Sequence, residues 1–281
     1  MKQRLITSTA ILLTVIPLII FSEYIVYPIV LAVLTNMAVY EIFNVIGVKK
    51  NYLLTMPAYV LSIALPIMAY FVERDGAGDF LLLIAALLFA YMIYMMAVSV
   101  FSKGKVPFFK MAESFTAVTY VVVSFTSLSL IRYLEREIGV YYLALVFIVA
   151  WVCDSLAFVV GSLFGKHKLI PEISPKKTVE GAIGGVVFGA VALLLYGFLL
   201  DKFIENMEVN YLFLALAGTI LSVVSQIGDL IASLIKREYG AKDYGKVLPG
   251  HGGIMDRFDS IFAIATVLLM LCMTWPPFKF I

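Results

Sequence analysis

The sequence has few charged residues and few cysteines. Charged side chains make up 14% of its 281 residues, whereas a soluble domain carries about 25%. Hydrophobic residues make up 62%. This balance excludes an ordinary water-soluble domain and indicates an integral membrane protein. The formal net charge of +2 points to no class of partner, and we expect no nucleic-acid partner.

The two cysteines, Cys153 and Cys272, lie in apolar runs far apart in the chain. Their spacing fits no metal-binding motif, and a free cysteine in such a run behaves as a small apolar side chain. We therefore expect neither a disulfide nor a zinc site. The sequence also has no polar linker, low-complexity tract or soluble domain.

Long apolar runs dominate instead. A bilayer core of about 30 Å needs roughly 20 apolar residues per helix, and about nine runs approach that length. They cover residues 5–21, 24–47, 53–72, 80–101, 113–131, 140–164, 180–200, 211–235 and 256–275. The predicted fold class is an all-α integral membrane protein with about nine transmembrane helices. We interpret the first run as a retained helix, because no small-residue cleavage site follows it.

Three polar residues, Asn36, Glu41 and Asn44, interrupt the second run. Glu41 is either an interior polar partner or a residue at the cytoplasmic interface of the membrane. We favour the interface.

The distribution of basic residues predicts the orientation. They gather at the N-terminus and in every second loop, whereas the intervening loops are mainly acidic. By the positive-inside rule, the N-terminus is cytoplasmic and the C-terminus lies outside. Intramembrane polar residues concentrate after residue 150. We therefore expect a scaffold of about five helices over residues 1–139, and a catalytic region of about four helices with two cytoplasmic loops over 140–281.

The most polar stretch spans residues 233–259. It carries both signs of charge, on Lys236, Arg237, Lys242, Asp243, Lys246, His251, Asp256, Arg257 and Asp259. Basic side chains suit phosphate oxygens, and carboxylates suit a hard cation that bridges those oxygens. Glycines at 250, 252 and 253 permit backbone conformations closed to other residues. Orientation alone would explain the basic residues, but not three aspartates and a glycine-flanked histidine.

The apolar run 211–235 carries one polar stripe. Its members recur at three- and four-residue steps, as expected for one helix face: Ser222, Ser225, Gln226, Asp229, Ser233 and Lys236. An unpaired Asp in a membrane costs roughly 3 kcal/mol or more, so Asp229 needs a partner or a water-filled cavity. A structural hydrogen bond is the alternative to a site.

Asp256 and Asp259 open the last predicted helix and share a face one turn apart. A helix N-terminus favours negative charge, which by itself would account for one of them. Our hypothesis is that Asp229 and Asp256 converge to hold a divalent ion, with Asp259 close by.

Asp154 lies near mid-membrane in the predicted helix 140–164. It either completes the acidic site or is a hydrogen-bonded packing residue. The loop that follows is basic and polar: Lys166, His167, Lys168, Ser174, Lys176, Lys177 and Thr178. This loop is a candidate clamp for a triphosphate or a lipid phosphate, and charge that only sets orientation or attracts anionic headgroups is the alternative.

Two local features follow in the same region. A turn is expected at Ser174–Pro175, because proline disfavours helix at the preceding residue. Gly181, Gly185 and Gly189, at four-residue spacing, let a neighbouring helix approach closely, so we interpret them as packing residues.

The pattern S-x-x-K-R-x₄-K-D-x-G-x₂-L-P-x-H-G-G-I-x-D-R-F-D is complete over residues 233–259. It resembles the signature of the phosphatidate cytidylyltransferase (CDP-diacylglycerol synthase) family. A second block, Asp154–Phe158 with residues 165–169 and 173–181, also resembles that family. The N-terminal half resembles it only in being hydrophobic, so no functional residue is carried over there.

The resemblance implies a nucleotidyltransferase that moves CMP from CTP to phosphatidate and releases pyrophosphate. It also implies dependence on Mg²⁺ and a homodimer. The orientation predicted from the basic loops makes it a multi-pass protein of the cytoplasmic (inner) membrane whose active site faces the cytoplasm. A second cation, the basis of CTP selection and the acyl-chain preference stay open.

Residue chemistry and resemblance together define three candidate groups. The metal ligands are Asp154, Asp229, Asp256 and Asp259. The catalytic group is Asp229, Asp256, Lys236, Arg237, Lys242, Asp243, His251, Arg257 and Asp259, in which His251 either contacts phosphate or orients the glycine-rich turn. The substrate-binding group is Lys166, Lys168, Ser174, Lys176, Lys177, Thr178, Ser233, Gly252 and Gly253.

Two rival functions fit part of the sequence. An ion-coupled transporter would also keep Asp154 and Asp229 in the membrane, but it needs no dense cytoplasmic loop of Lys, Asp, Gly and His. A polyprenol kinase or a sugar-phosphate transferase would share the chemistry of metal and phosphate. A panel of nucleotides and lipids separates these possibilities.

Overall fold

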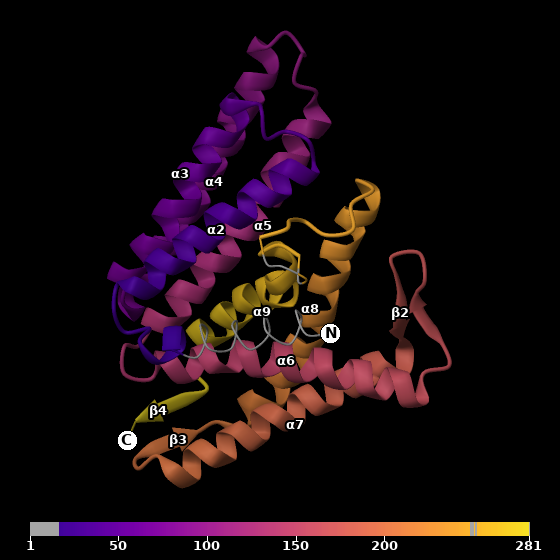
Figure 1. Ribbon diagram of the computed structural model, residues 1–281. Helices are drawn as coiled ribbons and strands as arrows, with labels where there is room; N and C mark the ends of the chain where they lie inside the picture. The colour runs from indigo at the N-terminus through magenta and orange to yellow at the C-terminus, as the bar shows by residue number, and fades with distance from the viewer. Residues whose placement is uncertain (1–16, 248–249, 251, 281) are drawn as a thin grey trace. The chain divides into compact units, whose positions relative to one another are not determined.

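The computed structural model describes residues 17–247, 250 and 252–280 (Figure 1). Within these residues, eight helices are long and apolar enough to cross a membrane. They are α2 (Val26–Val45), α3 (Tyr52–Met68), α4 (Ala77–Phe101), α5 (Phe108–Tyr133), α6 (Gly139–Phe164), α7 (Val179–Phe203), α8 (Tyr211–Glu238) and α9 (Met255–Thr274). The all-α membrane fold and eight of the predicted runs are confirmed. Most of the first run, 5–21, lies outside the described residues.

The chain divides into two compact units. The first contains the chain up to Arg136 together with Tyr239–Arg257, and the second contains Glu137–Glu238 together with the chain from Phe258 onward. The polar stretch 233–259 is therefore shared between them, since most of its loop belongs with the N-terminal helices. The predicted roles of scaffold for 1–139 and catalytic region for 140–281 stay a prediction, as does the predicted orientation.

The first unit is a bundle of α2, α3, α4 and α5, with two short 3₁₀ helices, η1 (Ala69–Phe71) and η2 (Arg74–Gly76), between α3 and α4. Helix α5 is the most buried of these spans and packs against the other three. Polar side chains link the helices inside the bundle. Asn36 of α2 donates to the Ser62 hydroxyl of α3 at 3.0 Å, and Ser129 of α5 donates to the Pro66 carbonyl at 2.8 Å.

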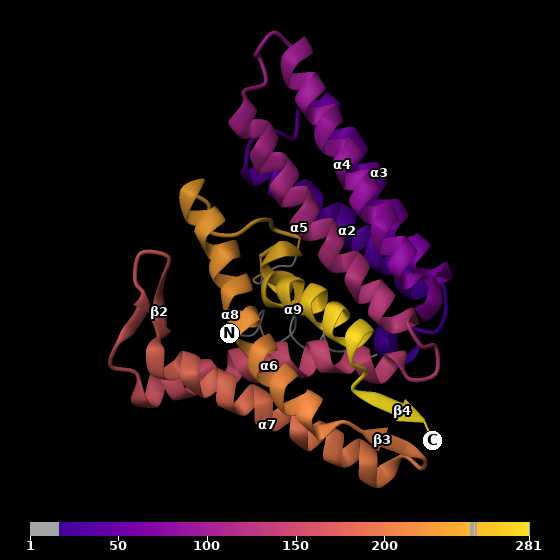
Figure 2. The same cartoon turned by 180° about the vertical axis from the view of Figure 1, so that it is seen from behind.

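The second unit is organised by α7, which runs beside α6 in both views (Figures 1 and 2) and also packs on α8. Glycines make these approaches close. A Cβ at Gly185 would lie 3.0 Å from the Cys153 carbonyl of α6, and a Cβ at Gly189 would overlap the Ser222 hydroxyl of α8. The interpretation of Gly181, Gly185 and Gly189 as packing residues is confirmed.

Two short antiparallel strand pairs lie in the second unit and were not predicted. Strand β1 (Lys168–Ile170) pairs with β2 (Ser174–Thr178), and β3 (Met207–Val209) pairs with β4 (Phe278–Phe280). The expected turn at Ser174–Pro175 was wrong by a few residues, because the turn occupies 171–173. Pro175 instead lies in β2 of a two-stranded sheet, where a missing N–H is tolerated at an edge.

The α7–α8 contact gives a test of this packing. A Cβ at Gly218 of α8 would lie 2.7 Å from the Ala190 Cα of α7. Because backbone cannot move aside as a side-chain tip can, we expect Gly218→Ala to cost about 1–3 kcal/mol of stability. The measurement is the thermal unfolding midpoint of the purified protein in detergent. Gly78→Ala in α4 is the matched control, since a Cβ there meets nothing within 4 Å, and equal midpoints for the two variants would contradict the packing assignment.

Candidate active site

A buried carboxylate holds the start of α9. Glu41 of α2 is 3% exposed, and its Oε1 and Oε2 accept the backbone N–H groups of Ile254 at 3.0 Å and Met255 at 2.9 Å. The first N–H groups of a helix have no partner within the helix and carry partial positive charge. Glu41 is thus an interior polar partner that caps α9, and its position at the cytoplasmic interface stays a prediction.

Two glycines of the polar loop make room for this carboxylate. A Cβ at either Gly245 or Gly253 would overlap the Glu41 carboxylate oxygens. The loop backbone therefore packs directly against the buried charge. A larger residue at either position would push the acceptor away from its donors.

Asp256 closes the same loop from within. Its side chain is 7% exposed, and its Oδ2 accepts the backbone N–H groups of Tyr244 at 2.8 Å and Gly253 at 2.9 Å. Gly252, with φ +84°, allows the tight bend beside it. The capping interpretation therefore applies to Asp256, and its role as a metal ligand stays a prediction.

A third contact fixes the beginning of the loop. The Lys110 ammonium of α5 donates to the Ile46 carbonyl at 3.0 Å and to the Tyr239 hydroxyl at 3.1 Å, and pairs with Glu113 at 3.0 Å. Burial and the Glu113 carboxylate raise the pKa of the Tyr239 hydroxyl, so it remains neutral. The described part of the polar loop is therefore held by α5 at Tyr239 and by α2 at Ile254 and Met255.

The second unit contains a separate acidic cluster, made of Asp154, Asp229 and Asp259. Asp229 pairs with Lys177 of β2, with 2.5 Å between Oδ2 and Nζ. The Ser260 hydroxyl donates to Asp154 Oδ2 at 2.9 Å. The charges of Asp229 and Asp154 act on Asp259, opposed by that of Lys236. Asp154 thus takes part in a packing hydrogen bond near the other two carboxylates, and its role in completing a metal site stays a prediction.

The acidic cluster suits a cation that arrives with its own oxygen ligands. Among the described residues, no three His, Cys, Asp or Glu side chains are placed to hold a metal ion by themselves. Mg²⁺ does not need such a cage, because it commonly takes one or two carboxylates and completes its shell with water and substrate phosphates. Carboxylates of α6, α8 and α9 with lysines beside them fit that pattern.

The polar stripe of α8 serves two purposes. Ser222 and Ser225 are buried, and Gln226 donates to the Ala182 carbonyl of α7 at 3.1 Å, so this part of the stripe is packing. Asp229, further along the helix, belongs to the acidic cluster, and the charge of Lys236 acts on Asp259 of that cluster. The stripe was correctly predicted as one face, but only its second half faces a candidate site.

The basic loop after α6 is the β1–β2 hairpin. Lys166, Lys168 and Lys176 are exposed on it, whereas Lys177 reaches Asp229. His167 Nδ1 lies 2.6 Å from Glu180 Oε1.

Thr178 is buried and caps α7, its hydroxyl accepting the Gly181 N–H at 3.1 Å. Capping accounts for Thr178 without a ligand, and its substrate contact stays a prediction.

The structure therefore gathers only part of the predicted site. Asp154, Lys177, Asp229, Lys236 and Asp259 lie close enough in the second unit for their charges to interact. Ser233 and Arg237 also belong to the second unit, whereas Lys242, Asp243 and Arg257 are exposed in the first unit, and His251 lies outside the described residues. Because Asp229 and Asp256 belong to different units, their convergence stays a prediction.

Sequence reasoning named Glu41 as a possible interior partner but did not predict that it caps α9. The available signal was a lone carboxylate in an apolar run, since a buried charge in a membrane helix needs a partner. Its partners are backbone N–H groups more than two hundred residues away, which no side-chain pattern encodes.

Comparisons with known proteins agree with these features. A sequence model described as the cytidylyltransferase family matches residues 2–275. The chain is 34% identical over 274 residues to a protein of Staphylococcus haemolyticus named phosphatidate cytidylyltransferase, covering 96% of this chain and 98% of that one. It is also 32% identical over 276 residues to the Bacillus subtilis protein of the same name, covering 96% and 97%.

The cap on α9 makes a testable prediction. Replacing Glu41 by Ala leaves two buried N–H groups without their acceptor, at a cost of about 1–3 kcal/mol for each. We expect Glu41→Ala to lower the unfolding midpoint and to speed protease cleavage within residues 242–247, with Glu41→Gln intermediate because one acceptor oxygen remains.

Glu73→Ala is the control, since that carboxylate is 76% exposed and its loss should change neither measurement. An unaltered midpoint and unaltered cleavage in Glu41→Ala would show that the carboxylate does not hold the loop.

Proposed function

The chain belongs to the cytidylyltransferase family of nucleotidyl-transferring enzymes, and we propose that it is a CTP:phosphatidate cytidylyltransferase. In this reaction, an oxygen of the phosphatidate phosphate attacks the α-phosphorus of CTP. The bond from the α-phosphorus to the bridging β-phosphate oxygen breaks, and the products are CDP-diacylglycerol and pyrophosphate.

The observation that supports this proposal best is the acidic cluster with its two lysines. Both substrates are strongly anionic, so the main barrier is repulsion and the build-up of charge on the leaving pyrophosphate. Fixed cationic groups that face that charge stabilise the transition state. The attacking oxygen is already an anion, so the reaction needs no strong general base and no serine nucleophile.

Each residue of the acidic cluster has a proposed task. Asp229 and Asp259 would hold Mg²⁺, and Asp154, held by Ser260, would add negative charge close by. When bound, Mg²⁺ withdraws charge from the phosphate oxygens and orients them. Lys177 and Lys236 are the cations already beside these carboxylates, so we assign them to the phosphate oxygens of the nucleotide.

The basic residues at the end of α8 and on the hairpin have supporting roles in the proposal. Arg237 Nε lies 3.5 Å from the Ile173 carbonyl, which ties the end of α8 to the turn of the hairpin. Exposed Lys166, Lys168 and Lys176 on that hairpin are proposed to attract the triphosphate. By the distribution of basic loops, this end of the second unit faces the cytoplasm of the inner membrane, where CTP is dissolved.

The proposed reaction is tested with purified protein and a panel of substrates. We expect pyrophosphate release only when phosphatidate, CTP and Mg²⁺ are present together, with little release from ATP, GTP or UTP and none with diacylglycerol. Release with a polyprenol or a sugar phosphate in place of phosphatidate would favour a different lipid-linked transferase. No conversion of CTP under any condition would reject the proposal.

The metal assignment has a test of its own. Chelation by EDTA should abolish turnover and excess Mg²⁺ should restore it. Asp229→Asn and Asp259→Asn should each lower kcat by roughly 100-fold or more, because each removes charge at the reacting phosphates. The control is Asp201→Asn, which changes an exposed carboxylate that accepts from Tyr211 and should leave turnover unchanged. Full turnover in Asp229→Asn would overturn the assignment.

Asp256→Asn separates two roles for that residue. A metal ligand would lose turnover while keeping the unfolding midpoint. A carboxylate that only closes the loop would lower the midpoint and speed cleavage of residues 242–247, as Glu41→Ala does.

A further inference from the structure

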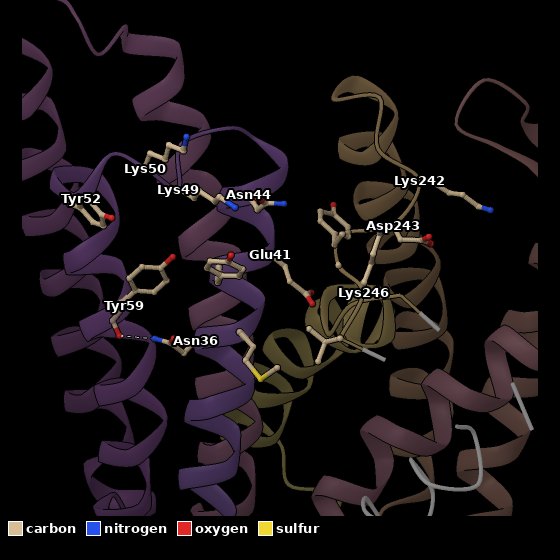
Figure 3. A pocket seen from close by; sticks show the side chains of 15 residues that line it. Asn36, Glu41, Asn44, Lys49, Lys50, Tyr52, Tyr59, Lys242, Asp243 and Lys246 are labelled. Carbon is tan, nitrogen blue, oxygen red and sulfur yellow. Dashed lines mark hydrogen bonds between the residues drawn. The ribbon is translucent and has the colours of Figure 1, made fainter. Parts of the chain in front are cut away.

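The first unit contains a large open cleft, separate from the acidic cluster to which the chemistry is assigned above. Its volume is about 1280 Å³. Side chains of α2, the α2–α3 loop and α3 form one wall, and residues 242–247 of the polar loop form the other (Figure 3). The cleft thus joins the family signature to the N-terminal half, from which the resemblance carried over no residue.

The cleft is rich in positive charge. Lys49, Lys50, Lys242 and Lys246 line it, with Glu41 and Asp243 as the carboxylates. The Glu41 oxygens are already occupied by the N–H groups of Ile254 and Met255, and Figure 3 shows Glu41 pointing toward the polar loop.

Within the part of the chain that the structure describes, no carboxylate forms an ion pair with Lys49, Lys50 or Lys246. These three ammonium groups are therefore the ones placed to receive an anion. Figure 3 shows Lys242 pointing outward from the cleft, so we assign it no contact.

Neutral polar and aromatic groups accompany the lysines on the α2–α3 side. The Lys49 ammonium lies 5.5 Å from the centre of the Tyr40 ring, which favours the cation over the ring face. Asn44 and Tyr59 line the same wall, and Asn36 is fixed there by its bond to Ser62. Amides and hydroxyls can donate to phosphate oxygens as the lysines do.

The position of the cleft indicates a lipid as the source of that phosphate. Lys49 and Lys50 lie between two helices that are long and apolar enough to span the membrane, the level at which lipid headgroups are found. Tyrosine at that level has an apolar ring and a polar tip. Beside the cleft, α3 exposes Tyr52 (72%) and Met56 (58%), an apolar surface on which acyl chains can remain in the bilayer.

From this arrangement we propose that the cleft is a docking site for the phosphate monoester headgroup of phosphatidate, held by Lys49, Lys50 and Lys246. The site lies wholly within the first unit and does not include the acidic cluster. The inference rests on the proposed function for the identity of the lipid. The ligand that the cleft would bind has a dianionic headgroup on a diacyl anchor.

The first experiment measures binding without chemistry. The full-length protein in neutral-lipid nanodiscs is titrated with a fluorescent phosphatidate in the absence of CTP and Mg²⁺. We expect the double variant Lys49→Gln/Lys50→Gln to bind about tenfold more weakly, since each exposed lysine near a membrane surface contributes a few-fold in affinity. Diacylglycerol with the same label should bind weakly to both proteins.

The matched control is Lys103→Gln/Lys105→Gln. These lysines are exposed in the α4–α5 loop, on the same predicted side of the membrane. Replacing them removes the same amount of positive charge as the test variant does. If the two double variants lose affinity equally, the effect is general attraction of anionic lipid to a basic face, and the docking site is rejected.

The second experiment is kinetic. In Lys49→Gln/Lys50→Gln, we expect KM for phosphatidate to rise about tenfold while KM for CTP changes less than twofold. A rise in KM for CTP instead would place the nucleotide in the cleft and overturn the proposal. Lysine-dependent phosphatidate binding in a protein that converts no CTP would reject the proposed reaction but keep the site, so the two failures are distinguishable.

Discussion

The structure depends on how one buried carboxylate is satisfied. Glu41 lies on a membrane-spanning helix, where an unpaired charge costs several kcal/mol. It is balanced by two N–H groups at the start of α9, which have no partners within their own helix. The Glu41 carboxylate gains two hydrogen-bond donors, and the first N–H groups of α9 gain an acceptor. This exchange binds the glycine-rich loop to the N-terminal bundle and explains why Gly245 and Gly253 cannot carry side chains.

Two acidic groups among the described residues differ in their surroundings. In the first unit, Glu41 and Asp256 are buried, and their carboxylate oxygens accept hydrogen bonds from backbone N–H groups. They therefore fix the conformation of a loop. In the second unit, Asp154, Asp229 and Asp259 lie near one another, with Lys177 and Lys236 as counter-charges. Like charges held together are costly unless a cation offsets them. This arrangement is the basis for the proposal that a cation enters with an anionic substrate.

Glycine has the complementary role in the second unit. Gly181, Gly185 and Gly189 bring α7 close to α6 and α8. Because lipid tails are as apolar as the side chains, the hydrophobic effect does not hold membrane helices together, and close backbone packing must stabilise the contact. That contact fixes the depth of Asp154 on α6 relative to Asp229 on α8. The glycine face of α7 thus positions the acidic cluster, as the Glu41 cap positions the polar loop.

The sequence by itself determined the features that depend on local composition and period. Eight spans followed from run length, the packing role of Gly185 from its spacing, and the polar face of α8 from its three- and four-residue steps. The tertiary structure decided which polar residues become partners. It paired Glu41 with backbone groups at the start of α9, turned Lys177 inward while its neighbour Lys176 stays exposed, and gave Asp256 a loop to close. Such pairings depend on which atoms come into contact in the folded chain. Because nearly every residue has a backbone N–H group, the sequence does not indicate which of them will be a partner.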